Sequence, residues 1–216
     1  MSTLFISKKE DDLKSQLSLF KAKSITVIAN SFLQFEGIPF RINSNYQAIF
    51  FGSPRAVDFF LKQEKIPENT FIGCIGDVTA QSLLEEGIKI DFIGKSAGNP
   101  SAVAKQFKEK IGEKHVLFPQ SSSSNRSIVS VFPSNQVEEV AIYKTVIVPQ
   151  TIPNCSIYVF TSPSNVDGFF KGNSIPKNAR IIAWGKTTEK HIISKGFSVD
   201  IVLKEASIEE LMSVLG

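Results

Sequence analysis

Small polar residues follow five of the short apolar runs in this sequence and come just before amphipathic stretches. Such segments can bind carboxylate or phosphate groups, because the first turn of a helix leaves its N–H groups without intrahelical partners. Helix capping by Ser, Thr or Asn is the alternative explanation for any one segment. Five segments of this kind favour binding of an anionic ligand. The candidate binding residues are Ser53, Arg55, Gly76, Thr79, Ser122, Ser123, Ser124, Ser162, Gly185, Lys186, Thr187 and Thr188.

Two sharper patterns indicate other chemistries, and neither is complete. Gly185-Lys186-Thr187 resembles the end of a nucleotide-binding P-loop, but Arg180 stands where that pattern requires glycine. The segment 94–98, Gly-Lys-Ser-Ala-Gly, fits the nucleophile elbow of serine hydrolases with Ser96 as nucleophile. Asn99-Pro100 delays the helix that should follow that serine at once. The two histidines have no partners at metal-ligand spacing, so we expect no metal site.

Composition narrows the class of protein. The chain has 216 residues, of which 42% are hydrophobic and 21% charged, as in an ordinary globular protein. Its 24 basic and 21 acidic residues give a net charge of +3 without a basic block, which argues against nucleic acid as a partner. No apolar run is long enough to span a membrane, and the first twelve residues lack a signal-peptide core. Cys74 and Cys155 indicate reduced thiols, so we expect a cytoplasmic protein without a membrane partner.

An internal repeat determines the predicted architecture. Residues 51–79 are echoed by residues 160–188 at a constant offset of 109, and the similarity continues without a gap to Lys95 and Lys204. Between positions 51 and 95, 16 of 45 residues are identical to their counterparts. The chain therefore contains two copies of one unit.

Short apolar runs alternate with amphipathic stretches in both copies, which predicts two similar parallel-sheet α/β domains. Each domain should be flavodoxin-like with about five strands. The predicted strands are 3–7, 25–29, 47–51, 70–75, 90–93, 115–119, 137–143, 157–160, 180–184 and 199–202. The predicted helices are 10–20, 54–64, 77–87, 100–112, 124–132, one from Pro163, one from Lys186 and one near 207–215.

The order of these elements predicts one discontinuous and one continuous domain. Domain A should comprise residues 1–32 and 146–216, and domain B residues 33–145. The chain passes between the two domains at two crossing segments, near 31–41 and 145–151. Both segments are β-rich and are expected to pair as a two-strand β-ladder hinge. Ligands of parallel sheets bind beyond the carboxyl ends of the strands. We therefore expect the active site in the interdomain cleft.

Several segments, taken in order, resemble the uroporphyrinogen-III synthase family from about residue 45 onward. They are FGSPRAVDFF, CIGDVTAQSLLEEGI, VLFPQSSSSNRSIV, EEVAIYKT, YVFTSPSNVDGFF and AWGKTTEKHIISKG. The resemblance implies two α/β domains joined by a ladder and a cyclising hydro-lyase of tetrapyrrole (haem) biosynthesis. Its substrate would be hydroxymethylbilane, closed to uroporphyrinogen III with inversion of ring D and loss of water, without a cofactor. Thr79, Ser162 and Thr188 match family positions at the cleft, whereas Gly52 departs from the threonine that is common there.

Tyr143 is the candidate catalytic residue. It ends the predicted strand 137–143 beside the second crossing, where a protonated phenol could donate to a departing hydroxyl group. The alternative is an aromatic side chain that only closes the hinge. A non-catalytic two-domain binding protein for an anionic small molecule is the alternative function, since a fold does not determine a function. We expect a monomer.

Overall fold

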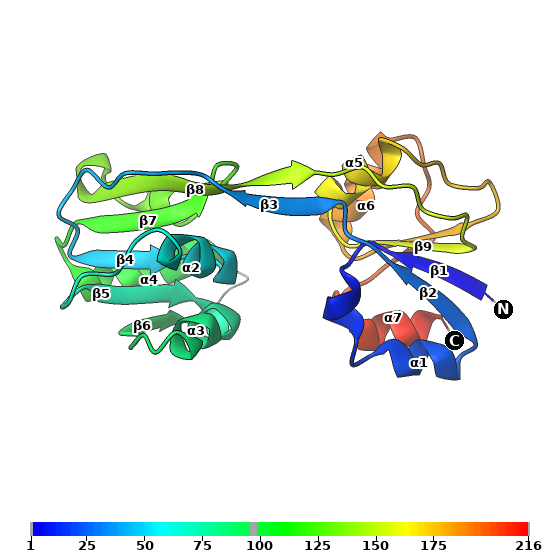
Figure 1. The fold of residues 1–216 in the computed structure, drawn as a ribbon, viewed down its shortest axis with the longest axis horizontal. Helices are drawn as coiled ribbons and strands as arrows, with labels where there is room; N and C mark the ends of the chain where they lie inside the picture. The colour runs from blue at the N-terminus through cyan, green and yellow to red at the C-terminus, as the bar shows by residue number, and fades with distance from the viewer. Residues whose placement is uncertain (1, 96–98, 216) are drawn as a thin grey trace. The chain divides into compact units, whose positions relative to one another are not determined.

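The computed structural model describes residues 2–95 and 99–215, which form two compact units (Figure 1). Unit 1 comprises Met1–Gln34 and Val146–Gly216, and unit 2 comprises Phe35–Thr145. Each unit contains one sheet with helices on both of its faces, so the predicted mixed α/β fold with parallel sheets is confirmed. Within the described residues, no helix is long and apolar enough to cross a membrane.

The sheet of unit 1 has five parallel strands in the order β11-β10-β9-β1-β2. They are β1 (Ser2–Ile6), β2 (Ile25–Ala29), β9 (Ile157–Phe160), β10 (Arg180–Ala183) and β11 (Ile201–Val202). The helices are η1 (Glu10–Leu13), α1 (Leu17–Ala22), α5 (Pro163–Phe170), α6 (Lys186–Ser194) and α7 (Ile208–Val214). Residues of α5 and α6 pack on one face around Phe5 and Phe160, and residues of α1 and α7 pack on the other around Leu4 and Ile6.

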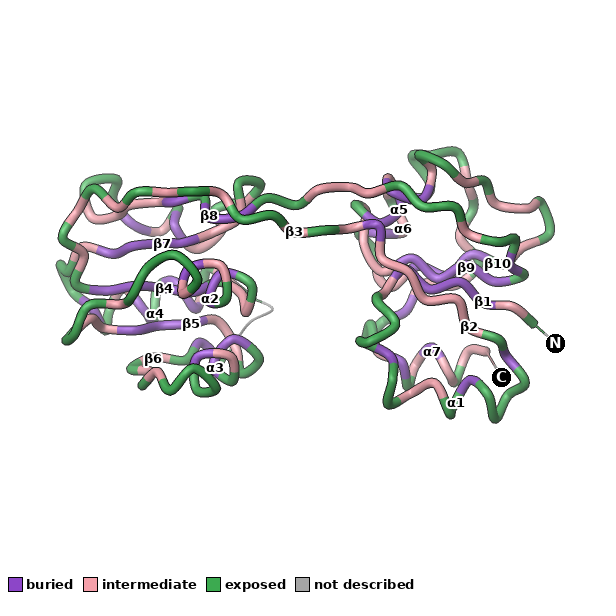
Figure 2. Tube along the Cα trace, viewed as in Figure 1, coloured by how far each residue is buried: buried purple, intermediate pink, exposed green. Residues whose placement is uncertain are grey.

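The sheet of unit 2 has six strands in the order β3-β8-β7-β4-β5-β6. They are β3 (Leu33–Gly37), β4 (Ala48–Phe51), β5 (Phe71–Ile75), β6 (Phe92–Gly94), β7 (Val116–Ser121) and β8 (Val137–Ile147). The helices are α2 (Pro54–Leu61), α3 (Gly76–Glu85), α4 (Pro100–Ile111), η2 (Val129–Val131) and η3 (Ser134–Gln136). Helices α2 and α3 cover one face and α4 the other, so β4 and β5 are almost wholly buried (Figure 2).

The two units share one strand order, which extends the repeat to the short segments. In unit 1, Leu4 of β1 pairs with Ile157 of β9; in unit 2, Val116 of β7 pairs with Ala48 of β4. Because Ile157 and Ala48 are repeat counterparts, Leu4 corresponds to Val116 and the offset between these two strands is 112. The five-strand order common to both units is that of flavodoxin-like sheets.

Two of the predicted helices are different in the structure. The predicted helix 10–20 is divided into η1 and α1, which bury Leu13 and Phe20 separately. The predicted helix 124–132 is wrong, because only η2 forms there. Arg126 has a positive φ of 57°, and its N–H donates to the Ser124 hydroxyl, so side chain–backbone bonds replace the helical ones.

The prediction of about five strands holds for unit 1, whereas β3 adds a sixth strand to unit 2.

The first crossing segment packs closely against α5 within unit 1. The Phe32 carbonyl accepts a hydrogen bond from the Val148 N–H at 2.8 Å. A Cβ atom added to Gly168 of α5 would lie 2.3 Å from the Cβ of Phe32. The repeat counterpart of Gly168 is Phe59, so this close approach is a feature of unit 1 alone.

We predict that Gly168→Ala destabilises the protein by about 1–2 kcal/mol. Overpacking in a tight core usually outweighs the helix-propensity gain of about 1 kcal/mol from replacing glycine by alanine. Gly172→Ala is the matched control, since a Cβ at Gly172 would meet no atom within 4 Å. Chemical unfolding curves should show a lower midpoint for the first variant only; equal midpoints would contradict the close packing.

Candidate active site

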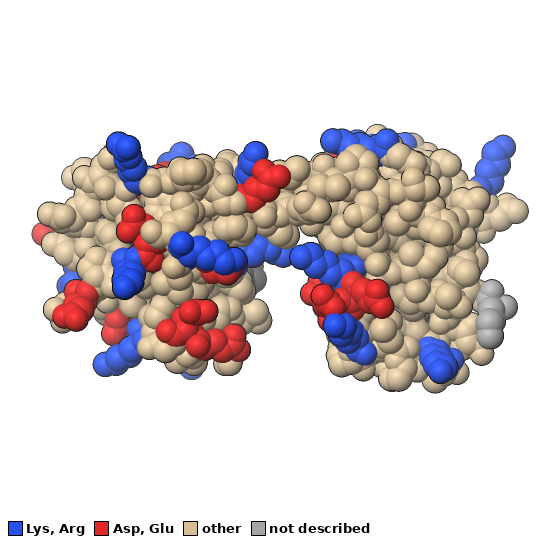
Figure 3. All heavy atoms as spheres, viewed as in Figure 1, with Lys and Arg blue, Asp and Glu red and all other residues tan. Residues whose placement is uncertain are grey.

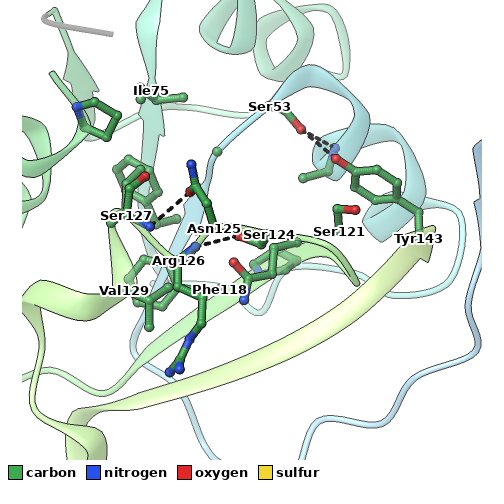
Figure 4. A pocket seen from close by; sticks show the side chains of 17 residues that line it. Ser53, Ile75, Phe118, Ser121, Ser124, Asn125, Arg126, Ser127, Val129 and Tyr143 are labelled. Carbon is green, nitrogen blue, oxygen red and sulfur yellow. Dashed lines mark hydrogen bonds between the residues drawn. The ribbon is translucent and has the colours of Figure 1, made fainter. Parts of the chain in front are cut away.

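A pocket of about 280 Å³ lies in unit 2 beyond the carboxyl ends of β4, β5 and β7 (Figure 4). Its apolar part consists of the side chains of Phe50, Ala56, Ile75, Pro100, Phe118, Pro119, Ile128 and Val129. Its polar part consists of Gly52, Ser53, Gln120, Ser121, Ser124, Asn125, Arg126, Ser127 and Tyr143. An apolar lining with a few polar groups is typical of a site that binds a small organic molecule.

Ser53 joins the pocket to the start of α2. Its backbone is extended, its hydroxyl accepts a hydrogen bond from the Ala56 N–H at 3.2 Å, and Pro54 occupies the first helical position. The same hydroxyl lies 3.4 Å from the hydroxyl oxygen of Tyr143 (Figure 4). Ser53 is therefore both the N-cap of α2 and the hydrogen-bond partner of the phenol.

Packing on two sides fixes the ring of Tyr143. The ring stacks on Phe59 with centroids 5.3 Å apart and meets the ring of Phe35 edge-on at 6.3 Å. Only 8% of the residue is exposed, so the hydroxyl group has little freedom to move away from the pocket. A register shift between Gln120 and Ser121 pairs Ser121 with Tyr143 and aligns the pocket loop with this residue.

The serine-rich loop after β7 is held by its own hydrogen bonds. The Ser122 N–H donates to the Tyr143 carbonyl at 2.9 Å, and the hydroxyls of Ser121 and Ser123 lie 3.1 Å apart. The Asn125 side chain accepts from the Ser127 N–H at 3.2 Å. Ser124 lines the pocket, whereas Ser122 and Ser123 are exposed outside its lining.

Charge at this pocket is largely compensated. The Arg126 guanidinium makes a two-pronged ion pair with Glu139, whose carboxylate also accepts from the Gln120 amide at 2.7 Å. The exposed Arg55 guanidinium lies over the ring of Phe35, 3.9 Å from its centroid. On the face drawn in Figure 3, basic and acidic side chains occur on each unit. The pocket is therefore close to neutral, with Arg55 as a nearby cation.

Four predicted residues of unit 1 lie at helix starts. Ser162 is the N-cap of α5 and accepts from the Asn165 N–H at 3.3 Å, as Ser53 does in unit 2. Gly185 is the N-cap of α6, and Lys186 and Thr187 are exposed in its first turn. The predicted anion-binding role of these residues remains a prediction.

The paired threonines are buried. Thr79 is 2% exposed and Thr188 is 4% exposed, and each lies in a helix three residues after a glycine. Gly76 begins α3 with a positive φ of 68°, a conformation that suits glycine. A ligand could reach either threonine hydroxyl only after local rearrangement, so their binding role also stays a prediction.

Burial makes the Cys74 thiol a poor nucleophile. Burial raises the pKa of the Cys74 thiol to about 11, with a smaller contribution from the charge of Asp77, so the thiol is protonated at neutral pH. Among residues 2–95 and 99–215, no group of three or more His, Cys, Asp or Glu side chains could hold a metal ion. Ser96, the nucleophile of the hydrolase pattern, lies outside the described residues.

Sequence reasoning missed one buried polar network in unit 1. The Asn165 side chain, which is 4% exposed, accepts from the Phe32 N–H at 3.0 Å and donates to the Ser7 carbonyl at 3.2 Å. It thereby joins the segments that follow β1, β2 and β9. Comparison of the two repeat copies could have revealed this residue, because Asn165 stands where the other copy has the small apolar Ala56.

Comparison with known proteins agrees with this architecture. The profile of the family described as Uroporphyrinogen-III synthase HemD matches residues 15–213. A uroporphyrinogen-III synthase from Chlorobaculum parvum is 26% identical, with 74% of each chain covered. The crystal structure of uroporphyrinogen-III synthetase from Helicobacter pylori is similar in fold, with a TM-score of 0.73 at 17% identity over 100% of this chain and 98% of that one. A mutant synthase from Thermus thermophilus gives a TM-score of 0.59 at 12% identity, over 100% of this chain and 98% of that one.

The family profile spans nearly the whole chain and covers most of both units. The likeness to solved structures supports the same fold independently. The chain therefore belongs to the uroporphyrinogen-III synthase family.

Proposed function

We propose that this protein closes hydroxymethylbilane to uroporphyrinogen III, with inversion of ring D and release of one water molecule. Family membership supports this reaction over the alternative of a non-catalytic binding protein. The observation that carries the proposal is the pocket of unit 2, where a fixed phenol and a capping serine face an apolar cavity. Such a cavity suits a pyrrole ring, and polar groups at its border suit the carboxylates of that ring.

The proposed reaction needs one proton donor and accurate placement of ring D. Proton transfer to the terminal hydroxyl group lets the C–O bond break, so that water leaves and an azafulvene forms. Ring D attacks this carbon through its substituted position and gives a spiro intermediate. Cleavage of the older C–C bond and reclosure at the free position then reverse ring D, and loss of a proton restores the aromatic pyrrole.

Tyr143 is the proposed donor of the first proton. Its hydroxyl borders the pocket, and the stacked ring of Phe59 prevents the phenol from swinging away. A phenol O–H can assist the departure of a hydroxyl group by donating a proton, and general acids usually accelerate such a step by about 10²–10⁴-fold. Ser53 would orient the phenol through their 3.4 Å contact.

Carboxylate binding is proposed for the polar segments at the helix starts and for the serine-rich loop after β7. Helix N-termini and exposed hydroxyls favour anions. In unit 2 these residues are Ser53, Arg55, Gly76, Thr79, Ser122, Ser123 and Ser124, and in unit 1 Ser162, Gly185, Lys186, Thr187 and Thr188. Holding several carboxylates orients the chain, and orientation of reacting groups alone can contribute several kcal/mol to catalysis. We further propose that the enzyme acts as a cytoplasmic monomer without nucleic acid, membrane or cofactor.

The product isomer tests the proposed reaction. Without a protein, hydroxymethylbilane closes at the free carbon of ring D and gives the uninverted type I isomer. Freshly made hydroxymethylbilane incubated with this protein should give mainly type III, as resolved by chromatography of the oxidised products. An isomer mixture equal to that of the protein-free control would reject the enzyme and favour a binding protein.

We predict that Tyr143→Phe lowers single-turnover rates about 10- to 1,000-fold while the substrate affinity changes little. The substitution retains the stacked ring and removes the donor. Tyr46→Phe is the matched control, because the buried hydroxyl of Tyr46 in the same unit has no hydrogen-bond partner among the described residues. The residual product of Tyr143→Phe should remain mostly type III. Equal rates for Tyr143→Phe and the wild type would remove Tyr143 from the mechanism.

A further inference from the structure

The sheet edge that bears the pocket of unit 2 has a counterpart edge in unit 1, because the two sheets share strand order and register. Leu4 pairs with Ile157 in unit 1, and Val116 pairs with Ala48 in unit 2. From these two equivalent pairs, each residue at the carboxyl edge of one sheet can be assigned its counterpart in the other sheet. The pocket residues Gly52, Ser53, Ala56, Ile75, Pro119 and Gln120 correspond to Thr161, Ser162, Asn165, Trp184, Ser7 and Lys8. The corresponding edge of unit 1 thus gains a cation and a large aromatic ring.

Lys8 and Trp184 are in contact across the end of β9. The ammonium nitrogen of Lys8 lies 5.1 Å from the centroid of the Trp184 ring, within the range of a cation–π interaction. Both residues are partly exposed. In the described part of the chain, no carboxylate lies within 4.0 Å of the Lys8 ammonium group.

The acidic residues nearest in sequence do not neutralise this lysine. Glu10, Asp11 and Asp12 belong to η1 and are exposed. Asp11 is paired with Lys14 at 2.6 Å, and that contact lowers the pKa of Asp11. Lys8 therefore presents a positive charge that is held by an aromatic face.

The rest of this edge is filled and hydrogen-bonded. Thr161 and Asn165 replace the small Gly52 and Ala56 of the other copy, so the counterpart site is expected to be shallower. The Ser7 hydroxyl accepts from the Thr161 N–H at 2.7 Å, and the Asn165 amide donates to the Ser162 hydroxyl at 3.2 Å. This network fixes the loops beneath Lys8.

The two edges consequently differ in chemistry. In unit 2, the counterpart of Lys8 is the neutral Gln120, whose amide is used by Glu139, and Arg126 is paired with that same carboxylate. In unit 1, Lys8 has no carboxylate partner among residues 2–95 and 99–215, and the indole of Trp184 stands where unit 2 has Ile75. The four rings of the substrate carry similar acidic substituents. Two sites that differ in charge and in aromatic stacking can therefore bind different rings of that substrate.

We propose that Lys8 and Trp184 form a second ring-binding subsite, in which the indole packs on a pyrrole and the ammonium group binds one of its carboxylates. This inference rests on the proposed function. Inversion of a single ring requires that one ring be held differently from the others, and two non-equivalent copies of one edge supply that difference. Unit 2 would hold the reacting end beside Tyr143, and Lys8 with Trp184 would hold another ring.

The test replaces two residues of unit 1 by the residues at the counterpart positions of unit 2. Lys8→Gln and Trp184→Ile introduce the side chains found at the counterpart positions of unit 2, and Lys9→Gln is the control with the same loss of charge one residue away. Lys8→Gln should raise KM for hydroxymethylbilane about 10- to 100-fold, the usual effect of losing a hydrogen bond to a charged group. We expect kcat to change less than about threefold, because other groups carry out the chemistry, whereas Lys9→Gln should match the wild type.

A binding measurement tests the subsite even if a variant, or the wild type, does not form product. Trp184 is the only tryptophan of the sequence, so its fluorescence reports on this site alone. Porphobilinogen, a single pyrrole with one acetate and one propionate group, should change that fluorescence in the wild type and in Lys9→Gln. The response of Lys8→Gln should require at least about tenfold more porphobilinogen.

The outcomes separate this inference from the proposed function. Type III product from the wild type, with equal KM for Lys8→Gln and Lys9→Gln, would overturn the subsite and leave the reaction intact. Absence of type III product with a Lys8-dependent fluorescence response would reject the reaction and retain a pyrrole carboxylate site. Absence of any response to porphobilinogen in the wild type, together with unchanged KM in Trp184→Ile, would also overturn the subsite.

Discussion

The parallel pairing of β1 with β9, and of β7 with β4, is the constraint on which the rest of the structure depends. Each pairing joins a short segment of the chain to a long segment that is distant in sequence, as when Leu4 meets Ile157. Without these pairings neither sheet would have its central strands, and the loops that follow the strands would not lie at one edge. Because all five strands in the common order run the same way, that edge collects helix starts, hydroxyls and backbone N–H groups.

Repetition of one unit provides two similar edges, and a few substitutions make them chemically different. In unit 2 the small residues Gly52 and Ala56 leave room for a pocket, and Phe59 supports the phenol of Tyr143. In unit 1, Gly168 replaces Phe59 and lets the first crossing segment pack against α5, while Asn165 binds the backbone of that segment. The same fold thus positions the proposed proton donor in one copy and a buried polar network in the other.

The sequence predicted the repeat and the strands other than β3, because buried parallel strands are continuous apolar runs and helix starts have clear capping residues. The loop after β7 was mispredicted as a helix. Its serines bond to the local backbone and Arg126 adopts a positive φ, neither of which appears in a hydrophobic pattern. The contact between Ser53 and Tyr143 depends on a register shift at Gln120, which only the fold reveals. The burial of Thr79 likewise follows from helix rotation and not from residue type.

The most direct measurement is a crystal structure of the protein with uroporphyrinogen III, grown without oxygen so that the product stays reduced. The account predicts a carboxylate of one ring within about 2.7–3.2 Å of the Lys8 ammonium nitrogen, with the pyrrole of that ring against Trp184. A different ring should lie in the pocket of unit 2 beside Ser53 and Tyr143. A tetrapyrrole bound away from the carboxyl edges of both sheets would contradict the central claim that the two copies hold different rings of one substrate.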